Sequence, residues 1–407
     1  MSKSFKHAML LDSHNYPDPY GKYERLAAFG AYRLLEAEKD AFDQLANFYE
    51  ERPSWLFGHL SYDLKNDIEQ LSSDHLKHFD FCQLCFFEPM HLLIQRRDST
   101  DLEYWSTEKV KGIEDLMHLK APTSPIMDHG NIRWSARQTK KQYIEAVNAL
   151  KEEIRYGNIY EINYCQEFYQ KEIELDPLSL AEDLSFNSPM PYGGYYKNGE
   201  DHLICASPER FLCKRARKVI AQPIKGTAKR VANKEEEIIK KRLKDDLKEQ
   251  TENVMIVDLM RNDLSKTAAK GSVKVEELFG VYTFPQVYQL ISTVSSELAE
   301  DKNFHELIKG AFPMGSMTGA PKISAMKLSE KYECFRRELY SGSIGYIEPN
   351  GDFDFNVVIR SMLYSSKSHY LSLAVGGAIT DMADAEKEYE ECLIKAEAVL
   401  KMQDQKE

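Results

Sequence analysis

The chain has 407 residues, of which 43% are hydrophobic and 29% charged, and its formal net charge is −12. A chain of this length and composition buries a sizeable core, either as two domains or as one large composite fold, which excludes a disordered protein. The negative charge argues against a nucleic-acid partner, because it repels a phosphate backbone.

No apolar stretch approaches the roughly 18 residues of a membrane span, and the amino-terminal sequence lacks the apolar segment of a secretory signal. We therefore expect a cytoplasmic protein without a membrane segment. Seven dispersed cysteines are typical of reduced thiols. Cys82 and Cys85 form a C-x-x-C pair, but no second pair or nearby histidine completes a zinc site, so we interpret them as core strand residues.

The first hundred residues alternate short apolar runs with turns. Their pattern predicts a helix over Glu24–Glu36 and strands over Trp55–Leu64 and Cys82–Gln95. The stretch 115–131, with two prolines and a glycine, is the best candidate for a linker. We therefore divide the chain into an amino-terminal scaffold, residues 1–120, and a second region, residues 135–405.

The second region has clearer periodicity. Apolar spacing predicts helices over Lys140–Arg155 and Lys234–Asp263, and strands over Ile159–Gln170, Ser341–Ile347, Phe353–Tyr364 and Tyr370–Val375. Runs of strands separated by long helices, without strict alternation, favour an α+β fold.

Two short motifs place a charged side chain in a tight apolar setting. Glu209 lies in SPERF, which in isolation is a charged turn. Lys225 lies in PIKGT, where it either extends from a strand edge or is desolvated. A desolvated lysine has a lowered pKa and becomes a nucleophile at neutral pH.

Three glutamates form a second group of candidates. Glu252 opens an apolar helical turn, and Glu388 and Glu391 share one face of a later helix at i,i+3 spacing. Together they make an oxygen-rich set suited to Mg²⁺, although the spacing fits an acidic solvated helix equally well.

The segment FPMGSMTGAPK places two glycines and two hydroxyls before a predicted helix near Pro321, an arrangement that suits a carboxylate ligand. Ala320 and Pro321 separate Gly319 from Lys322, so the segment lacks the Walker spacing. This spacing does not support an NTP-binding protein.

Taken in order, these segments closely resemble the chorismate-binding enzyme family, which includes anthranilate, aminodeoxychorismate, isochorismate and salicylate synthases. The resemblance covers roughly residues 140–400, and MLLDS (Met9–Ser13) and FGHLSYDL (Phe57–Leu64) resemble the family's amino-terminal portion. It implies two large packed β-sheets flanked by helices, with the active site in a cleft between them. LLDS is also similar to a tryptophan-sensing segment, which implies an effector site within residues 1–120, although folate enzymes share related segments.

The resemblance also assigns roles. It implies that Glu252, Glu388 and Glu391 hold Mg²⁺, which binds the ring carboxylate of chorismate. The remaining groups implied to contact the substrate are Thr318, near the ring, and Tyr340, Arg360, the backbone at Gly376 and Gly377, and Lys395, near its carboxylates.

Lys225 distinguishes between members of the family. Anthranilate and isochorismate synthases usually carry alanine there, whereas PIKGT resembles aminodeoxychorismate synthase component I, in which the lysine attacks C2 of chorismate and ammonia then enters at C4. Glu209 would act as general acid and base on the C4 side. Two positions depart from the amine-transferring members: Glu161 stands where glutamine is common, and Gln289 where histidine is common.

The resemblance therefore implies conversion of chorismate and ammonia to 4-amino-4-deoxychorismate, in para-aminobenzoate and folate biosynthesis. The sequence has no G-x-C-x-G nucleophile loop, so a separate glutamine amidotransferase subunit is expected to supply the ammonia. Anthranilate synthase component I is the alternative enzyme. A catalytically inert binding subunit would be favoured if the Mg²⁺ ligands or Lys225 were missing, and all are present.

Overall fold

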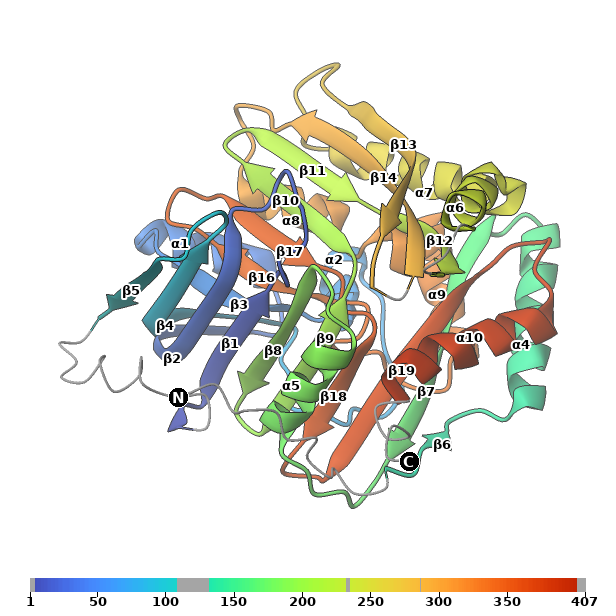
Figure 1. The fold of residues 1–407 in the computed structure, drawn as a ribbon, viewed down its shortest axis with the longest axis horizontal. Helices are drawn as coiled ribbons and strands as arrows, with labels where there is room; N and C mark the ends of the chain where they lie inside the picture. Colours follow the sequence, from blue (N-terminus) through green and yellow to red (C-terminus); the bar gives the residue numbers. More distant parts are fainter. Residues whose placement is uncertain (1–3, 108–131, 232–234, 286, 401–407) are drawn as a thin grey trace.

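The computed structural model describes residues 4–107, 132–231, 235–285 and 287–400. Helices surround a large antiparallel sheet, which confirms the α+β class (Figure 1). The predicted linker at 115–131 falls outside the described ranges. Within those ranges, every helix is too short or too polar to cross a lipid bilayer.

The described strands form one network of 19 in which paired neighbours run antiparallel. The network consists of two runs of strands that meet at β4 (Leu84–Arg96). The first run continues from β4 through β2 (Tyr23–Ala37), β1 (His7–Asp12), β8 (Tyr192–Asn198), β9 (Asp201–Ser207), β18 (Ser361–Ser365), β19 (Tyr370–Ile379) and β7 (Glu161–Gln170). Short strands extend it: β5 (Leu102–Ser106) beside β4, and β6 (Ser135–Ala136) and β15 (Gly319–Ala320) beside β7.

The second run continues from β4 through β3 (Leu56–Leu60), β16 (Ser343–Ile347), β17 (Phe353–Asn356), β10 (Arg210–Arg215), β11 (Lys218–Gln222) and β14 (Val287–Glu297). The strands β12 (Ile224–Lys229) and β13 (Lys274–Thr283) both pair with β14. The two expected sheets thus correspond to two runs of one network, because β4 pairs with β2 along its length and with β3 over its first residues.

Helices cover both runs. They are α1 (Ala41–Glu51), α2 (Lys65–Glu69), α4 (Lys140–Arg155), α5 (Pro177–Asn187), α6 (Glu236–Asp245), α7 (Leu247–Ser265), α8 (Phe304–Ala311), α9 (Lys322–Tyr332) and α10 (Ala385–Leu400). The helices α4 and α10 lie side by side next to β19, whereas α7 contacts β14 and β12 (Figure 1). Apolar side chains fill both interfaces, which fixes α10 and α7 relative to the strands of the predicted site.

Two segments that were predicted to be single helices have a different secondary structure. The predicted helix over Glu24–Glu36 is wrong, because this segment is the long strand β2, paired on one edge with β1 and on the other with β4. Its alanines and leucines favour helix locally, but pairing on both edges outweighs that preference. The predicted helix over Lys234–Asp263 is divided at Asp246, which has extended backbone and caps α7 by accepting hydrogen bonds from the N–H groups of Lys248 and Glu249.

The other predicted elements agree with the structure apart from their ends. The helix over Lys140–Arg155 is confirmed as α4, which begins with a capping box at Thr139. The predicted strand over Phe353–Tyr364 is two strands, β17 and β18, separated by residues that include Arg360 at φ 51°. This turn directs the chain from the second run into the first.

Candidate active site

Lys225 is a buried side chain on β12. Its Nζ lies 2.6 Å from Oε1 of Glu161, the first residue of β7, and the two side chains are 9% and 1% exposed. Burial disfavours the charged amine, but the negative charges of Glu161 and Glu252 outweigh burial and raise the pKa of Lys225. From the sequence alone, we expect the pKa of Lys225 to be lowered if the side chain is desolvated. Because the fold brings β7 to β12, the amine is instead ion-paired and charged in the free protein.

Glu209 lies between β9 and β10 and is almost completely buried. Burial raises the pKa of its carboxyl to about 7, although Ser316, Lys225 and Arg360 nearby lower it. Burial lowers the pKa of the Arg360 guanidinium to about 10, although the negative charge of Glu209 raises it. The structure therefore brings Glu209, Lys225 and Arg360 into electrostatic contact, with Glu209 poised to exchange a proton near neutral pH.

The three predicted metal ligands come from two helices that face each other. Lys248 on α7 places its Nζ 3.6 Å from Glu252 Oε1 and 3.3 Å from Glu388 Oε1, so it bridges α7 and α10. On α10, Lys395 lies 2.8 Å from Glu391 Oε1 and donates a hydrogen bond to the Gly376 carbonyl at 2.9 Å. These lysines gather the acidic side chains at the end of β19.

The acidic group meets several requirements of a Mg²⁺ site. Burial raises the pKa of Glu252 to about 7, and burial with the neighbouring Glu391 raises that of Glu388. Glu252 Oε1 is buried and has no hydrogen-bond partner in the described structure, and the Lys248 amine approaches it only to the ion-pair distance of 3.6 Å. Among the described residues, the ligand atoms of Glu252, Glu388 and Glu391 do not all lie within 4.8 Å of one another. The all-oxygen donor set fits Mg²⁺, and the three carboxylates would have to lie closer together to share one ion.

Gly377 and Gly376 on β19 leave room beside this group. A Cβ added to Gly377 would lie 3.3 Å from Glu388 Oε2 and 4.0 Å from Lys395 Nζ. A Cβ on Gly376 would come within 2.6 Å of Cys165 Sγ. The two glycines thus let the backbone of β19 approach the site closely, as expected from the sequence.

Tyr340 and Thr318 approach the same region through β7. The hydroxyl of the buried Tyr340 lies 3.9 Å from the thiol of Cys165, next to Gly376. The carbonyl of Thr318 accepts a hydrogen bond from Asn163 at 2.8 Å, while its hydroxyl donates to Met314 at 3.2 Å. The structure therefore places all eleven predicted site residues around the region where β7, β12, β19, α7 and α10 come together.

Three further residues belong to this region but were not assigned roles from the sequence. Glu161 was noted only as a departure from a pattern, and its pairing with Lys225 depends on two distant strands meeting. Lys248 was detectable, because it precedes Glu252 by one helical turn. Ser316 lies beside Glu209 and lowers the pKa of that carboxyl.

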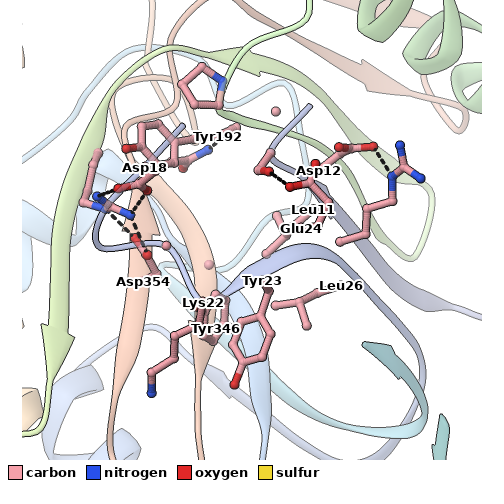
Figure 2. A pocket seen from close by; sticks show the side chains of 18 of the residues that line it. Leu11, Asp12, Asp18, Lys22, Tyr23, Glu24, Leu26, Tyr192, Tyr346 and Asp354 are labelled. Carbon is pink, nitrogen blue, oxygen red and sulfur yellow. Dashed lines mark hydrogen bonds and ion pairs between the residues drawn. The ribbon is translucent and has the colours of Figure 1, made fainter. Parts of the chain in front are cut away.

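A separate pocket lies in the amino-terminal half and includes part of the MLLDS motif. It is lined by Leu11, Asp12 and Ser13, and Ser13 donates a hydrogen bond to Glu24 at 2.6 Å (Figure 2). Figure 2 shows Asp18 and Asp354 converging at one side of the pocket. There the fully buried Arg210 binds both, at 2.5 and 2.9 Å. Arg210 directly follows Glu209 in the chain, so the pocket wall and the predicted catalytic acid share one stretch of backbone.

The sequence is similar to several known enzymes. Anthranilate synthase component 1 of Thermus thermophilus is 34% identical over 364 residues, which cover 84% of this chain and 76% of that protein. Aminodeoxychorismate synthase component 1 of Escherichia coli is 35% identical over 269 residues, or 66% of this chain. This chain spans 59% of the length of the E. coli protein, and 30% of the probable chloroplastic aminodeoxychorismate synthase of Oryza sativa.

A solved structure shares the fold. Anthranilate synthase component I of Streptococcus pneumoniae aligns with a TM-score of 0.82 over 95% of this chain and 93% of that one, at 21% identity. At this identity the likeness concerns the fold alone. The family of chorismate binding enzymes matches residues 6–401. Since that match includes nearly every residue of the sequence, the chain belongs to the chorismate-binding enzyme family.

Proposed function

We propose that this chain is an aminodeoxychorismate synthase component I, which converts chorismate and ammonia to 4-amino-4-deoxychorismate. The observation that carries the proposal is the buried amine of Lys225, held 2.6 Å from Glu161 and in electrostatic contact with Glu209. A nucleophilic amine beside a carboxyl group with a pKa near neutrality suits displacement of a hydroxyl. The E. coli relative, which carries this name, supports the assignment.

Substrate binding follows from the charges around the amine. Glu252, Glu388 and Glu391 would hold Mg²⁺, which supplies a positive charge for the ring carboxylate of chorismate. Arg360 and Lys395, with Tyr340 and the backbone at Gly376 and Gly377, would hold the remaining carboxylate oxygens. Thr318 would lie against the ring. These contacts fix C2 of the ring within reach of Lys225.

The proton on Lys225 must leave before the amine can attack. Glu161 is the nearest acceptor, so the ion pair becomes a neutral amine and a neutral carboxyl group. The amine nitrogen then bonds to C2, both ring double bonds shift, and the C4–O bond breaks so that the hydroxyl leaves as water with the proton of Glu209. Ammonia attacks C4, the C2–N bond breaks, and Lys225 regains its proton from Glu161. Glu209 takes a proton from the new C4 ammonium group, which restores the starting state.

Ammonia would come from a glutamine amidotransferase on a separate subunit. This sequence contains no G-x-C-x-G nucleophile loop for glutamine hydrolysis. The E. coli and T. thermophilus relatives are both named "component 1", which supports a multi-subunit enzyme.

Anthranilate synthase component I is the second candidate, favoured by the similarity to the T. thermophilus protein over 84% of this chain. That reaction adds ammonia at C2 and releases pyruvate, and members with this activity usually carry alanine in place of Lys225. The buried amine therefore favours amination at C4.

Product identification tests the proposal. The chain is incubated with chorismate, Mg²⁺ and ammonium salt, and the products are identified by chromatography and mass spectrometry. We expect 4-amino-4-deoxychorismate. Anthranilate with pyruvate, or isochorismate, would refute the assignment, and an absence of turnover with bound chorismate would indicate an inert subunit.

The variant Lys225→Ala tests the covalent route. It is expected to lower C4 amination by more than about 10³-fold, the scale on which loss of a covalent nucleophile acts. Calorimetry should still detect Mg²⁺-dependent binding of chorismate, because the metal ligands remain. Amination at the parental rate would show that the lysine forms no covalent intermediate.

A further inference from the structure

A second group of metal-binding side chains lies where β2, β3 and β4 meet. Cys85 on β4 is directly opposite Glu36 on β2, and Cys82 precedes the start of β4. The two sulfur atoms and a carboxylate oxygen of Glu36 all lie within 4.8 Å of one another. The C-x-x-C pair had no third ligand nearby in the sequence, and the pairing of β2 with β4 supplies one.

The surroundings hold this group in place and leave one side open. His59 on β3 lies with Nε2 2.8 Å from the Cys82 carbonyl and Nδ1 3.0 Å from the Tyr196 hydroxyl, so the buried ring fixes the backbone of the turn. Both cysteines are buried, whereas Glu36 is exposed. The exposed carboxylate therefore gives a metal ion a route from solvent to the two buried sulfur atoms.

The donor types select the metal. Two thiolates with one carboxylate favour Zn²⁺, whereas Mg²⁺ prefers oxygen ligands alone. In a tetrahedral zinc site with Zn–S bonds of about 2.3 Å, neighbouring ligand atoms lie about 3.8 Å apart. That separation lies within the 4.8 Å limit that encloses the three ligand atoms.

We propose that Glu36, Cys82 and Cys85 bind one Zn²⁺ ion, with water as the fourth ligand. Binding replaces the protons of the thiol groups, which pass to solvent, and changes no oxidation state. The ion would join the end of β2 to the start of β4, the strand shared by the two runs of the sheet. This site has no residue in common with the chorismate site and does not depend on the proposed function.

Cobalt substitution tests the site. The full chain, reduced and freed of metal with a chelator, is titrated with Co²⁺ and followed by absorbance. We expect one equivalent to produce a thiolate-to-cobalt charge-transfer band, which Zn²⁺ abolishes and excess Mg²⁺ does not. Cys82→Ser and Cys85→Ser should lose the band, whereas Cys334→Ser, which changes an exposed cysteine outside the cluster, should keep it.

Two further measurements guard against misfolded variants. Glu36→Gln changes an exposed side chain, so it should fold normally, keep the thiolate band and bind Co²⁺ more weakly. Zn²⁺ should raise the Tm of the parent protein, because it binds the folded state, and raise that of Cys82→Ser much less. The proposal is wrong if the parent shows no thiolate band, if the band survives in Cys82→Ser or disappears in Cys334→Ser, or if Glu36→Gln binds as tightly as the parent.

Discussion

Lys225 and Glu161 share one proton in two arrangements, a buried ion pair or a neutral amine beside a neutral carboxyl group. The separation of 2.6 Å allows direct transfer between them without an intervening water. Because transfer to Glu161 keeps the proton within the pair, formation of the nucleophile requires no loss of a proton to solvent. This distinguishes Glu161 from glutamine, which cannot accept the proton.

Glu161→Gln is therefore expected to make formation of the lysine adduct depend on pH in a new way. At pH 6.5 the variant should be about 10²-fold slower than the parent, the usual contribution of a general base. The ratio of the parent rate to the Glu161→Gln rate should fall as the pH rises, because the amine of Lys225 in the variant then loses its proton to water. Rapid quenching and intact-mass spectrometry measure the adduct.

The matched control is Glu153→Gln, which removes a carboxylate paired with Lys331 at 3.3 Å on the surface of α4. Its rates should follow the parent at every pH. A loss in Glu161→Gln that is equal at all pH values would indicate a purely structural role for Glu161.

Because Glu209 acts as a general acid, we expect the rate of adduct formation in the parent enzyme to have the opposite pH dependence. Burial raises the pKa of its carboxyl to about 7, so the group is protonated below pH 7 and ionised above it. As a general acid it must be protonated, and adduct formation should decline as the pH rises from 7 to 9. Glu209→Gln should be about 10² to 10⁴-fold slower and lose this decline. Persistence of the decline in the variant would assign it to another group.

The sequence motifs identify the charged residues of the site, but they do not predict the pKa shifts of these residues. PIKGT marked Lys225 as unusual, and burial is confirmed, but the direction of its pKa shift depends on Glu161 on a different strand. The pairing of Cys85 with Glu36 is non-local in the same way. Local spacing could reveal only pairs within one helix, such as Lys248 with Glu252.

At the scale of elements, the short strand β15 determines where Glu161 lies. Gly319 pairs with Ile162 and has φ +147°, which favours glycine, and a Cβ there would lie 2.2 Å from the Glu161 carbonyl oxygen. The pairing of β15 with β7 thus requires glycine at this position.

Gly319→Ala is expected to displace the start of β7, lower amination, and destabilise the fold by about 1 to 3 kcal/mol more than Gly271→Ala. Gly271 also has a positive φ, +75°, but a Cβ there would meet no atom within 4 Å, so it isolates the backbone effect. Urea denaturation and product assays measure the two effects. Equal destabilisation by the two substitutions would contradict the steric argument.

Helices and strands are predicted correctly where the local apolar periodicity matches the face that packs on the core. The periodicity of residues 140–155 predicts α4 correctly, because this helix lies with one apolar face on the core. The pattern of residues 24–36 predicts a helix, but the strands that pair with both edges of β2 cannot be inferred from this segment alone. The pairing of β4 with both β2 and β3, which joins the two runs of strands, likewise cannot be inferred from the sequence of β4 alone.

At the scale of the whole molecule, Arg210 connects segments that are far apart in the chain. It binds Asp18 and Asp354 while fully buried, and also donates a hydrogen bond to Gln222 at 2.6 Å. Arg210→Met leaves the buried Asp18 without its paired cation, while Asp354 keeps Arg215 at 2.7 Å, so we expect a loss of about 3 to 5 kcal/mol in the free energy of unfolding.

Arg25→Met provides the comparison, because Arg25 is 56% exposed and pairs with Asp12 at 2.8 Å. Its loss should cost about 0 to 1 kcal/mol. Urea denaturation of both variants measures the difference. A loss below 1 kcal/mol in Arg210→Met would show that this cluster contributes little to stability.

The order of strands in the second run has a consequence for synthesis on the ribosome. Strand β3 pairs with β16, which lies roughly 280 residues later in the chain. At about 5 to 20 residues per second, β3 is translated about 15 to 60 s before its partner exists. During that interval its apolar residues have no strand to pair with on one edge, so the nascent chain is exposed to aggregation and suited to chaperone binding.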